Sequence, residues 1–67
     1  MTWSMLLRML TEAEARVANE SLPEDVRERS AETVSLCKER MAREGVTLEE
    51  LKQLAFEESR EGAGYAA

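Results

Sequence analysis

Apolar residues recur at helical spacing in three segments of the chain, which are separated by short polar or glycine-containing stretches. We therefore predict helices over about 3–20, 22–44 and 48–60 in a small all-α protein. These helices make one helical domain, 1–61, followed by a flexible tail, 62–67, that is rich in Gly and Ala. The second and third helices are expected to pack antiparallel as a helical hairpin.

The junction between the second and third predicted helices carries the clearest local signals. Gly45 can take the left-handed conformation that ends a helix. Thr47 and Glu50 have the spacing of a capping box, in which each side chain accepts a hydrogen bond from the other residue's backbone N–H. Val46 and Leu51 stand where a hydrophobic staple would close across the same turn. The sequence therefore predicts the end of one helix and the start of the next at this point.

The first ten residues are the most apolar part of the chain, and they fit both a helix and a strand. A helix places on one face, or beside it, the residues Trp3, Leu6, Leu7, Leu10, Met5 and Met9. A strand places on one face the residues Trp3, Met5, Leu7 and Met9. Leu, Met and Arg favour a helix, which is the structure we expect, while the strand stays open as the alternative.

Two further patterns bear on where the helices begin. Thr11 and Glu14 have capping-box spacing, which would start a helix near residue 12 and leave the first ten residues as a separate arm. Otherwise Thr11 lies inside a helix that begins near residue 3. For the second helix, Ser21 is the expected N-cap, with Pro23 in the first turn and Glu24 reaching back to the cap.

At 67 residues the chain can bury only a marginal hydrophobic core. Small domains usually gain stability from disulfides, a metal ion or oligomerisation. The one cysteine, Cys37, has no partner for an internal disulfide, and the absence of histidine argues against a structural zinc site. Oligomerisation or folding against a partner remains, and we expect a homodimer that holds no metal ion and no cofactor.

The formal net charge of −5 argues against nucleic acid as a partner, because phosphate binding needs clustered Lys and Arg. The longest apolar stretch, 5–10, is interrupted by Arg8 and is too short to span a bilayer, and no signal peptide is recognisable. We expect a cytoplasmic protein with no membrane partner. We expect no catalysis, because Cys37 has no histidine base and the chain has no Gly-rich phosphate loop.

Residues 41–51, Met-Ala-Arg-Glu-Gly-Val-Thr-Leu-Glu-Glu-Leu, resemble the turn of helix-turn-helix DNA-binding regulators. The resemblance covers about a dozen residues and implies a recognition helix over 48–60. Four glutamates outnumber Lys52 and Arg60 in that helix, so its surface would repel phosphates. Ala42 also stands three residues before Gly45, where the pattern of that family usually has four.

A second resemblance is to ribbon-helix-helix repressors, with 3–9 as the ribbon and 22–26, Leu-Pro-Glu-Asp-Val, opening the first helix. Residues 11–20 intervene here, whereas in that family the ribbon leads directly into its helix. Both resemblances imply the alternative function, a small DNA-binding transcriptional regulator or antitoxin. Its phosphate contacts would be Arg27, Arg29, Lys38, Arg40 and Arg43.

The large apolar side chains of the first ten residues favour another protein as the partner. Met adapts to varied surfaces, and Trp anchors many interfaces. We therefore expect a non-catalytic regulator, inhibitor or adaptor that binds through an apolar helical surface as a homodimer. The expected interface residues are Trp3, Met5, Leu6, Leu7, Met9, Leu10, Leu54 and Phe56. For the N-terminal segment itself, we favour a place in a three-helix core or in the homodimer interface over a groove for a specific partner.

Overall fold

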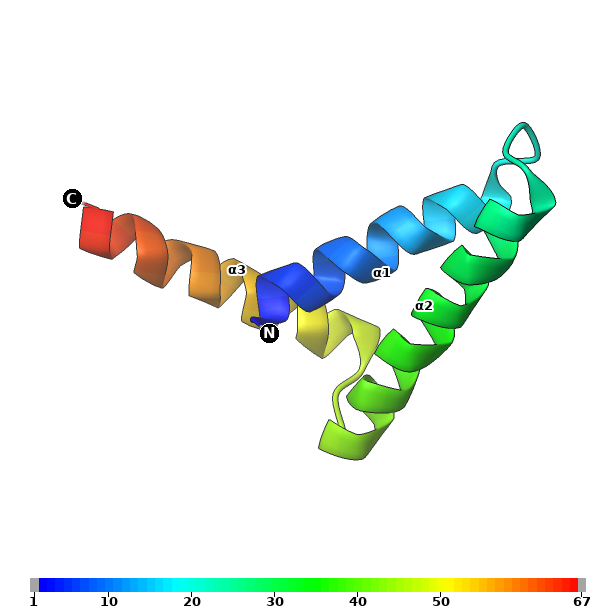
Figure 1. Cartoon of the computed structure of the whole chain (residues 1–67). Helices are drawn as coiled ribbons and strands as arrows, with labels where there is room; N and C mark the ends of the chain where they lie inside the picture. Colours follow the sequence, from blue (N-terminus) through cyan, green and yellow to red (C-terminus); the bar gives the residue numbers. More distant parts are fainter. Residues whose placement is uncertain (1, 67) are drawn as a thin grey trace.

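The protein is built from three α-helices, shown in Figure 1. The computed structural model describes the backbone of residues 2–66 and the side chains of residues 2–60. Helix α1 spans Trp3–Ala18, α2 spans Glu24–Glu44 and α3 spans Leu48–Ala66. No strand occurs between residues 2 and 66, so the all-α prediction is confirmed.

Helix α1 is continuous through residues 3–10, where the sequence was compatible with both a helix and a strand. The Thr2 hydroxyl caps its N-terminus by accepting a hydrogen bond from the Met5 N–H at 3.1 Å. Thr11 lies inside the helix, where its hydroxyl donates to the Leu7 carbonyl at 2.8 Å. The pairing of Thr11 with Glu14 therefore does not begin a helix, and α1 ends at Ala18, close to the predicted end.

The turn before α2 corrects the prediction that Ser21 is the N-cap. Asn19 organises this turn, because its side-chain oxygen accepts from the Ser21 N–H at 3.0 Å and its carbonyl accepts from the Leu22 N–H at 3.2 Å. Leu22 precedes Pro23, and the residue before a proline is disfavoured in the helical conformation. Pro23 therefore takes the N-cap position, without a side-chain hydrogen bond, and α2 begins at Glu24.

The end of α2 has the structure that its sequence predicts. Gly45 adopts the left-handed conformation, with φ 66° and ψ 32°. The Gly45 N–H donates to the Ala42 carbonyl at 3.2 Å, and the Val46 N–H donates to the Met41 carbonyl at 2.8 Å. These two bonds form a Schellman motif, which satisfies carbonyl groups that the last turn of a helix otherwise leaves without a partner.

The start of α3 confirms the predicted capping box. The Thr47 hydroxyl accepts a hydrogen bond from the Glu50 N–H at 3.2 Å, and the Thr47 N–H donates to Glu50 Oε1 at 3.4 Å. Val46 and Leu51, on either side of the cap, both pack in the hydrophobic core. The same short segment therefore ends α2, starts α3 and contributes to the core.

The hydrophobic core lies where the three helices meet. It is formed by five buried side chains: Leu6, Leu10, Cys37, Met41 and Leu51. Leu51 has 0% of its surface exposed, and Leu6 has 2%. Because these side chains come from all three helices, no two of the helices would enclose the core alone.

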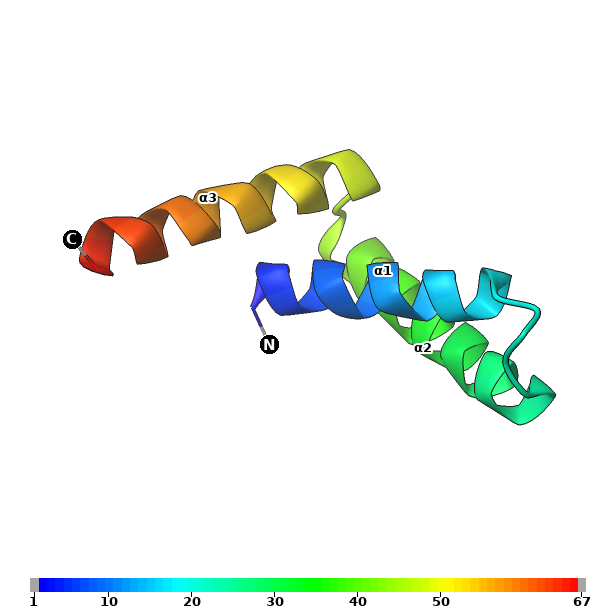
Figure 2. The same cartoon turned by 90° about the horizontal axis from the view of Figure 1, so that it is seen from above.

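The structure does not show the expected packing of the second helix against the third. Helix α1 packs extensively against both α2 and α3, whereas α2 and α3 have little direct contact. Figures 1 and 2 show α3 turning away from α2 after the Gly45 junction and crossing the N-terminal part of α1. Leu6 and Leu10 of α1 pack beside Leu51, so α1 becomes the main partner of α3.

The molecule is elongated for its length. Its Cα radius of gyration is 13.8 Å, and its principal extents are 43 × 27 × 18 Å. A compact domain of this length has a radius of gyration of about 11 Å. Helix α3 continues to Ala66, beyond the predicted end near residue 60, and its C-terminal part extends past the other two helices (Figure 1). The flexibility of the predicted tail, 62–67, stays a prediction.

A carboxylate from α3 holds the N-terminus of α1. Glu58 Oε2 accepts a hydrogen bond from the Trp3 N–H at 3.1 Å, and Glu58 Oε1 accepts one from the Ser4 N–H at 3.1 Å. The Ser4 hydroxyl donates to the Ala55 carbonyl at 3.3 Å. Since the N-terminal N–H groups of a helix have no partner within the helix, Glu58 acts as a tertiary cap that ties α3 to α1.

The hydrogen bonds to Glu58 make the stability of the fold depend on pH. The Ser4 N–H is the main reason why the pKa of Glu58 lies below its ordinary value of 4.5; partial burial opposes this effect, and the Trp3 N–H adds to it. A carboxyl group with a lowered folded-state pKa contributes stability that is complete above its ordinary pKa. This contribution is lost as the pH falls through the lower, folded-state pKa.

We expect Glu58→Gln to lower the melting temperature at neutral pH, because the amide carries no charge to complement the N-terminus of α1. The difference from the wild type should narrow as the pH falls from 4.5 through the lower, folded-state pKa of Glu58, because the capping carboxylate becomes protonated there. Melting curves by circular dichroism across the acidic range measure both effects. Glu57→Gln is the matched control, because Glu57 is the exposed neighbour of Glu58. Equal melting temperatures for the wild type and Glu58→Gln at neutral pH would contradict a capping role.

Candidate protein-binding surfaces

The structure divides the eight predicted interface residues between the core and the surface. Leu6 and Leu10 are each only 2% exposed and belong to the core. Trp3 and Leu7 are partly buried and pack against that core. Leu54, on α3, is also partly buried. Leu6 and Leu10 of the N-terminal segment therefore help to join the three helices, as expected if this segment takes part in a three-helix core.

Trp3 lies at the edge of the core, next to α2. The guanidinium carbon of Arg40 lies 5.9 Å from the centroid of the Trp3 ring, within the range of a cation–π interaction. Arg40 Nε also lies 3.5 Å from Glu44 Oε2, one turn further along α2. The Trp3 ring is therefore covered in part by a charged side chain of its own chain.

Three of the predicted residues remain well exposed: Met5 at 54%, Met9 at 38% and Phe56 at 62%. Met5 and Met9 lie one helical turn apart on α1 and form one apolar edge. Leu7 faces α3, and each methionine stands two residues from Leu7, about 200° around the helix. The two methionines therefore lie on the side of α1 away from Phe56, and the predicted interface falls on two separate surfaces.

One of these surfaces is an open groove between α1 and α3, with a volume of about 560 Å³. Leu7 and Thr11 line it from α1, and Lys52, Ala55 and Phe56 line it from α3. The groove mixes apolar and polar side chains, and the Phe56 ring stands at its exposed edge. Phe56 is the largest exposed side chain of this surface.

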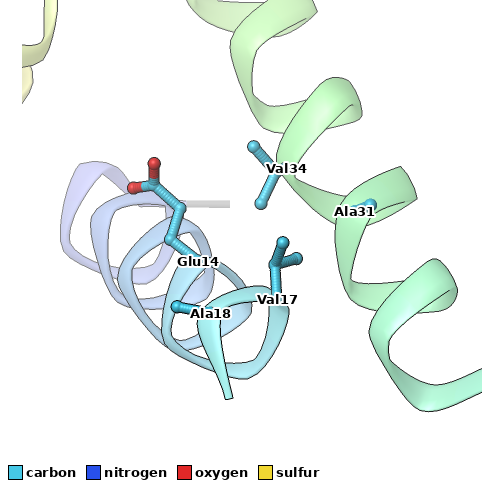
Figure 3. Close-up of a pocket in the computed structure, with 5 residues that line it drawn as sticks. All are labelled: Glu14, Val17, Ala18, Ala31 and Val34. Carbon is cyan, nitrogen blue, oxygen red and sulfur yellow. The ribbon is translucent and has the colours of Figure 1, made fainter. Parts of the chain in front are cut away.

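A second groove, with a volume of about 240 Å³, lies between the C-terminal half of α1 and the N-terminal half of α2. Figure 3 shows its lining residues, which are Glu14, Val17, Ala18, Ala31 and Val34. Four of the five are apolar, and Glu14 is the charged one. The sequence did not predict this groove.

The small side chains of this part of α2 explain why the groove is open. Around Ala31 the apolar stripe has no large side chain, and Ser30 takes a buried position, where its hydroxyl donates to the Val26 carbonyl at 2.9 Å. Val17 and Val34 are only partly buried. Residues 27–33 contain no large apolar residue, and this is the sequence signal from which an unfilled surface could have been predicted.

The buried cysteine and the arrangement of the acidic side chains bear on catalysis and metal binding. Burial raises the pKa of the Cys37 thiol, which is 4% exposed, so the reactive thiolate is disfavoured. Among the side chains of residues 2–60, no group of three or more His, Cys, Asp or Glu gathers as metal ligands. Over the same part of the chain, no helix is both long enough and apolar enough to cross a membrane.

Two of the basic residues considered as phosphate contacts bind within the protein. Arg27 Nε donates to the Val17 carbonyl at 3.4 Å, which joins α2 to the C-terminal end of α1. Arg40 interacts with the Trp3 ring and the Glu44 carboxylate. Both arginine side chains therefore make contacts within their own chain.

No protein-family model, no curated protein and no solved structure matches the chain. The described residues define an acidic, three-helix protein with an exposed methionine edge, a mixed groove beside Phe56 and an apolar groove between α1 and α2. A function is therefore inferred from the contacts, exposure and charge of these surfaces.

Proposed function

We propose that the protein is a non-catalytic, cytoplasmic, protein-binding regulator, inhibitor or adaptor that acts through an apolar helical surface and works as a homodimer. The observation that carries this proposal is the exposure of Met5 and Met9, one turn apart on α1, whereas the neighbouring Leu6 and Leu10 are buried. Flexible, polarisable methionine side chains adapt to the surfaces of partner proteins. Adjacent exposed apolar side chains are typical of sites where proteins meet.

The charge distribution favours a protein over a nucleic acid as the partner. Helix α3 carries Glu49 and Glu50 in its first turn, the part of a recognition helix that would enter the DNA groove. Arg27 and Arg40 already bind groups of their own chain. These features support protein binding, and the DNA-binding alternative becomes one outcome of the test.

The methionine edge is tested with the double variant Met5→Glu, Met9→Glu as bait beside the wild-type protein. Both sites are exposed, so the variant should fold, which circular dichroism can verify. We expect at least one protein, identified by mass spectrometry, to bind the wild type and to be lost from the variant. Ala15→Glu, at an exposed site on the same helix, is the control and should retain it.

Two results would contradict the proposal. One is the recovery of the same proteins by the wild type and by the double methionine variant. The other is binding of nonspecific duplex DNA at low salt that falls steeply as salt is added, which is the signature of phosphate neutralisation. Titration of a labelled duplex with the wild-type protein measures this second result directly.

A further inference from the structure

The face of the molecule that carries α3 has the shape of a step. Figure 2 shows α3 lying over the N-terminal part of α1, while the other end of the α1–α2 pair has no helix above it. The contacts of Ser4 with Ala55 and Glu58 fix α3 at that position. The apolar α1–α2 groove lies on the uncovered part, between Val17 on α1 and Val34 on α2 (Figure 3).

An exposed aromatic side chain stands beside this uncovered groove. Phe56, with 62% of its surface exposed, lines the α1–α3 groove together with Thr11 of α1. Glu14 and Ala18 follow Thr11 by about one and two helical turns on the same side of α1, and both line the α1–α2 groove. A protruding ring and an apolar groove therefore lie next to each other on one side of a single helix.

We propose that the α1–α2 groove is filled by Phe56 of a second copy of this chain, in a two-fold symmetric dimer with two equal junctions. This inference deepens the proposed function, because it rests on the homodimer and names the surface that forms it. A two-fold interface is self-complementary, so it requires a ring and a matching groove on the same face of each copy. In this dimer, α3 of each copy lies over the end of the α1–α2 pair that the other copy's own α3 leaves uncovered.

Charge is complementary at the proposed junction. Glu14 is the charged side chain that lines the apolar groove. Lys52 precedes Phe56 by one turn of α3 and lines the same side of that helix. When Phe56 of one copy enters the groove of the other, the acid at the groove and the base beside the ring bring opposite charges together.

The surface that one chain exposes beyond that of a compact monomer is similar in size to one partner's share of a dimer interface. The chain exposes 5161 Å². A compact monomer of 7.6 kDa exposes about 4300 Å², so this chain exposes roughly 900 Å² more. A standard protein interface buries about 800 Å² of each partner. The excess surface of the elongated chain, to which the projecting end of α3 contributes, is therefore about as large as one partner's share of an ordinary interface.

The test measures molar mass by sedimentation equilibrium over a range of concentrations, for variants at both halves of the junction. Phe56→Gln removes the ring, and Ala31→Glu places a charge in the groove at an exposed site. We expect each variant to weaken dimerisation by about 30-fold or more, because a central apolar contact is lost. Leu48→Gln is the matched control: Leu48 is 43% exposed and lines neither of the two grooves.

Mixing the two variants provides a specific check of the pairing. Neither variant alone retains an intact junction, but a dimer of Phe56→Gln with Ala31→Glu retains one, between the Phe56 ring and the unmodified groove. We therefore expect the mixture to dimerise more tightly than either variant. A wild type that stays monomeric, a Phe56→Gln variant that dimerises like the wild type, or a mixture no tighter than its components would overturn the inference. Loss of a captured protein from the methionine variant would still support protein binding in each of these cases, whereas a monomeric wild type would also contradict the homodimer of the proposed function.

Discussion

Replacing Leu51 with Ala is expected to remove most of the stability of the fold. Leu51 is fully buried, with 0% of its surface exposed, and it packs in the cluster that joins all three helices. Truncating a buried leucine to alanine typically costs about 2–5 kcal/mol. A core in a domain this small rarely supplies more than about 3–5 kcal/mol, so the loss is comparable to the whole free energy of unfolding.

The measurement for Leu51→Ala is urea denaturation followed by circular dichroism, with Leu48→Ala as the control. Leu48 lies on the same helix but is 43% exposed, so its truncation should change the denaturation midpoint little. We expect Leu51→Ala to lose its cooperative transition or to shift it to a much lower urea concentration. Equal midpoints for the two variants would mean that Leu51 is not a central contact of the core.

Replacing Gly45 with Val is expected to destabilise the protein by more than about 1 kcal/mol. Gly45 has φ +66°, a conformation that a β-branched residue adopts only with strain. An added Cβ at this position meets nothing within 4 Å, so the cost comes from the backbone and not from a steric clash with neighbours. The free energy of unfolding from urea denaturation gives the size of the effect.

Gly45→Asn separates backbone strain from other consequences of adding a side chain. Asparagine tolerates the left-handed conformation better than valine does, so its destabilisation should be clearly smaller. If Asn and Val were to lower the stability equally, the left-handed conformation at the end of α2 would not be the cause. Open space around position 45 makes the comparison clean, because neither side chain has to displace a neighbour.

The junction at Gly45 could be predicted from the sequence because all of its interactions are local. The Schellman bonds and the capping box join groups that lie within five residues of each other. Gly45, Thr47 and Glu50 therefore determine the local structure with little help from the rest of the chain. The helical character of the first ten residues followed in the same way, from residue propensities and spacing.

The arrangement of the helices could not be predicted, because it depends on contacts between distant residues. A local pattern shows that α3 begins at Leu48, but it does not show whether α1 or α2 will cover Leu51. The start of α2 was misplaced for a related reason: Asn19 provides the hydrogen bonds of the turn, whereas only Ser21 was considered as a cap. Glu58, likewise, has no sequence neighbour that identifies it as the cap of α1.

The candidate surfaces also divide into features that local sequence predicts and features that depend on contacts between distant residues. Exposed apolar residues such as Met5, Met9 and Phe56 could be singled out because each is large, apolar and set to one side of a helical stripe. The α1–α2 groove could not, since it exists only once Val17 and Val34 are placed on facing helices. A groove made by small side chains exists only when α1 and α2 are packed together. The sequence of either helix alone gives only a weak indication of it.

The tertiary cap has a consequence for the order in which the protein is made. Glu58 binds the N–H groups of Trp3 and Ser4 across 55 and 54 residues of sequence. A ribosome adds the N-terminal residues first, so the first turn of α1 is synthesised long before the carboxylate that satisfies it. A chain interrupted before residue 58 therefore has both N–H groups without that partner, and the tertiary cap of α1 can form only after more than half of α3 has been translated.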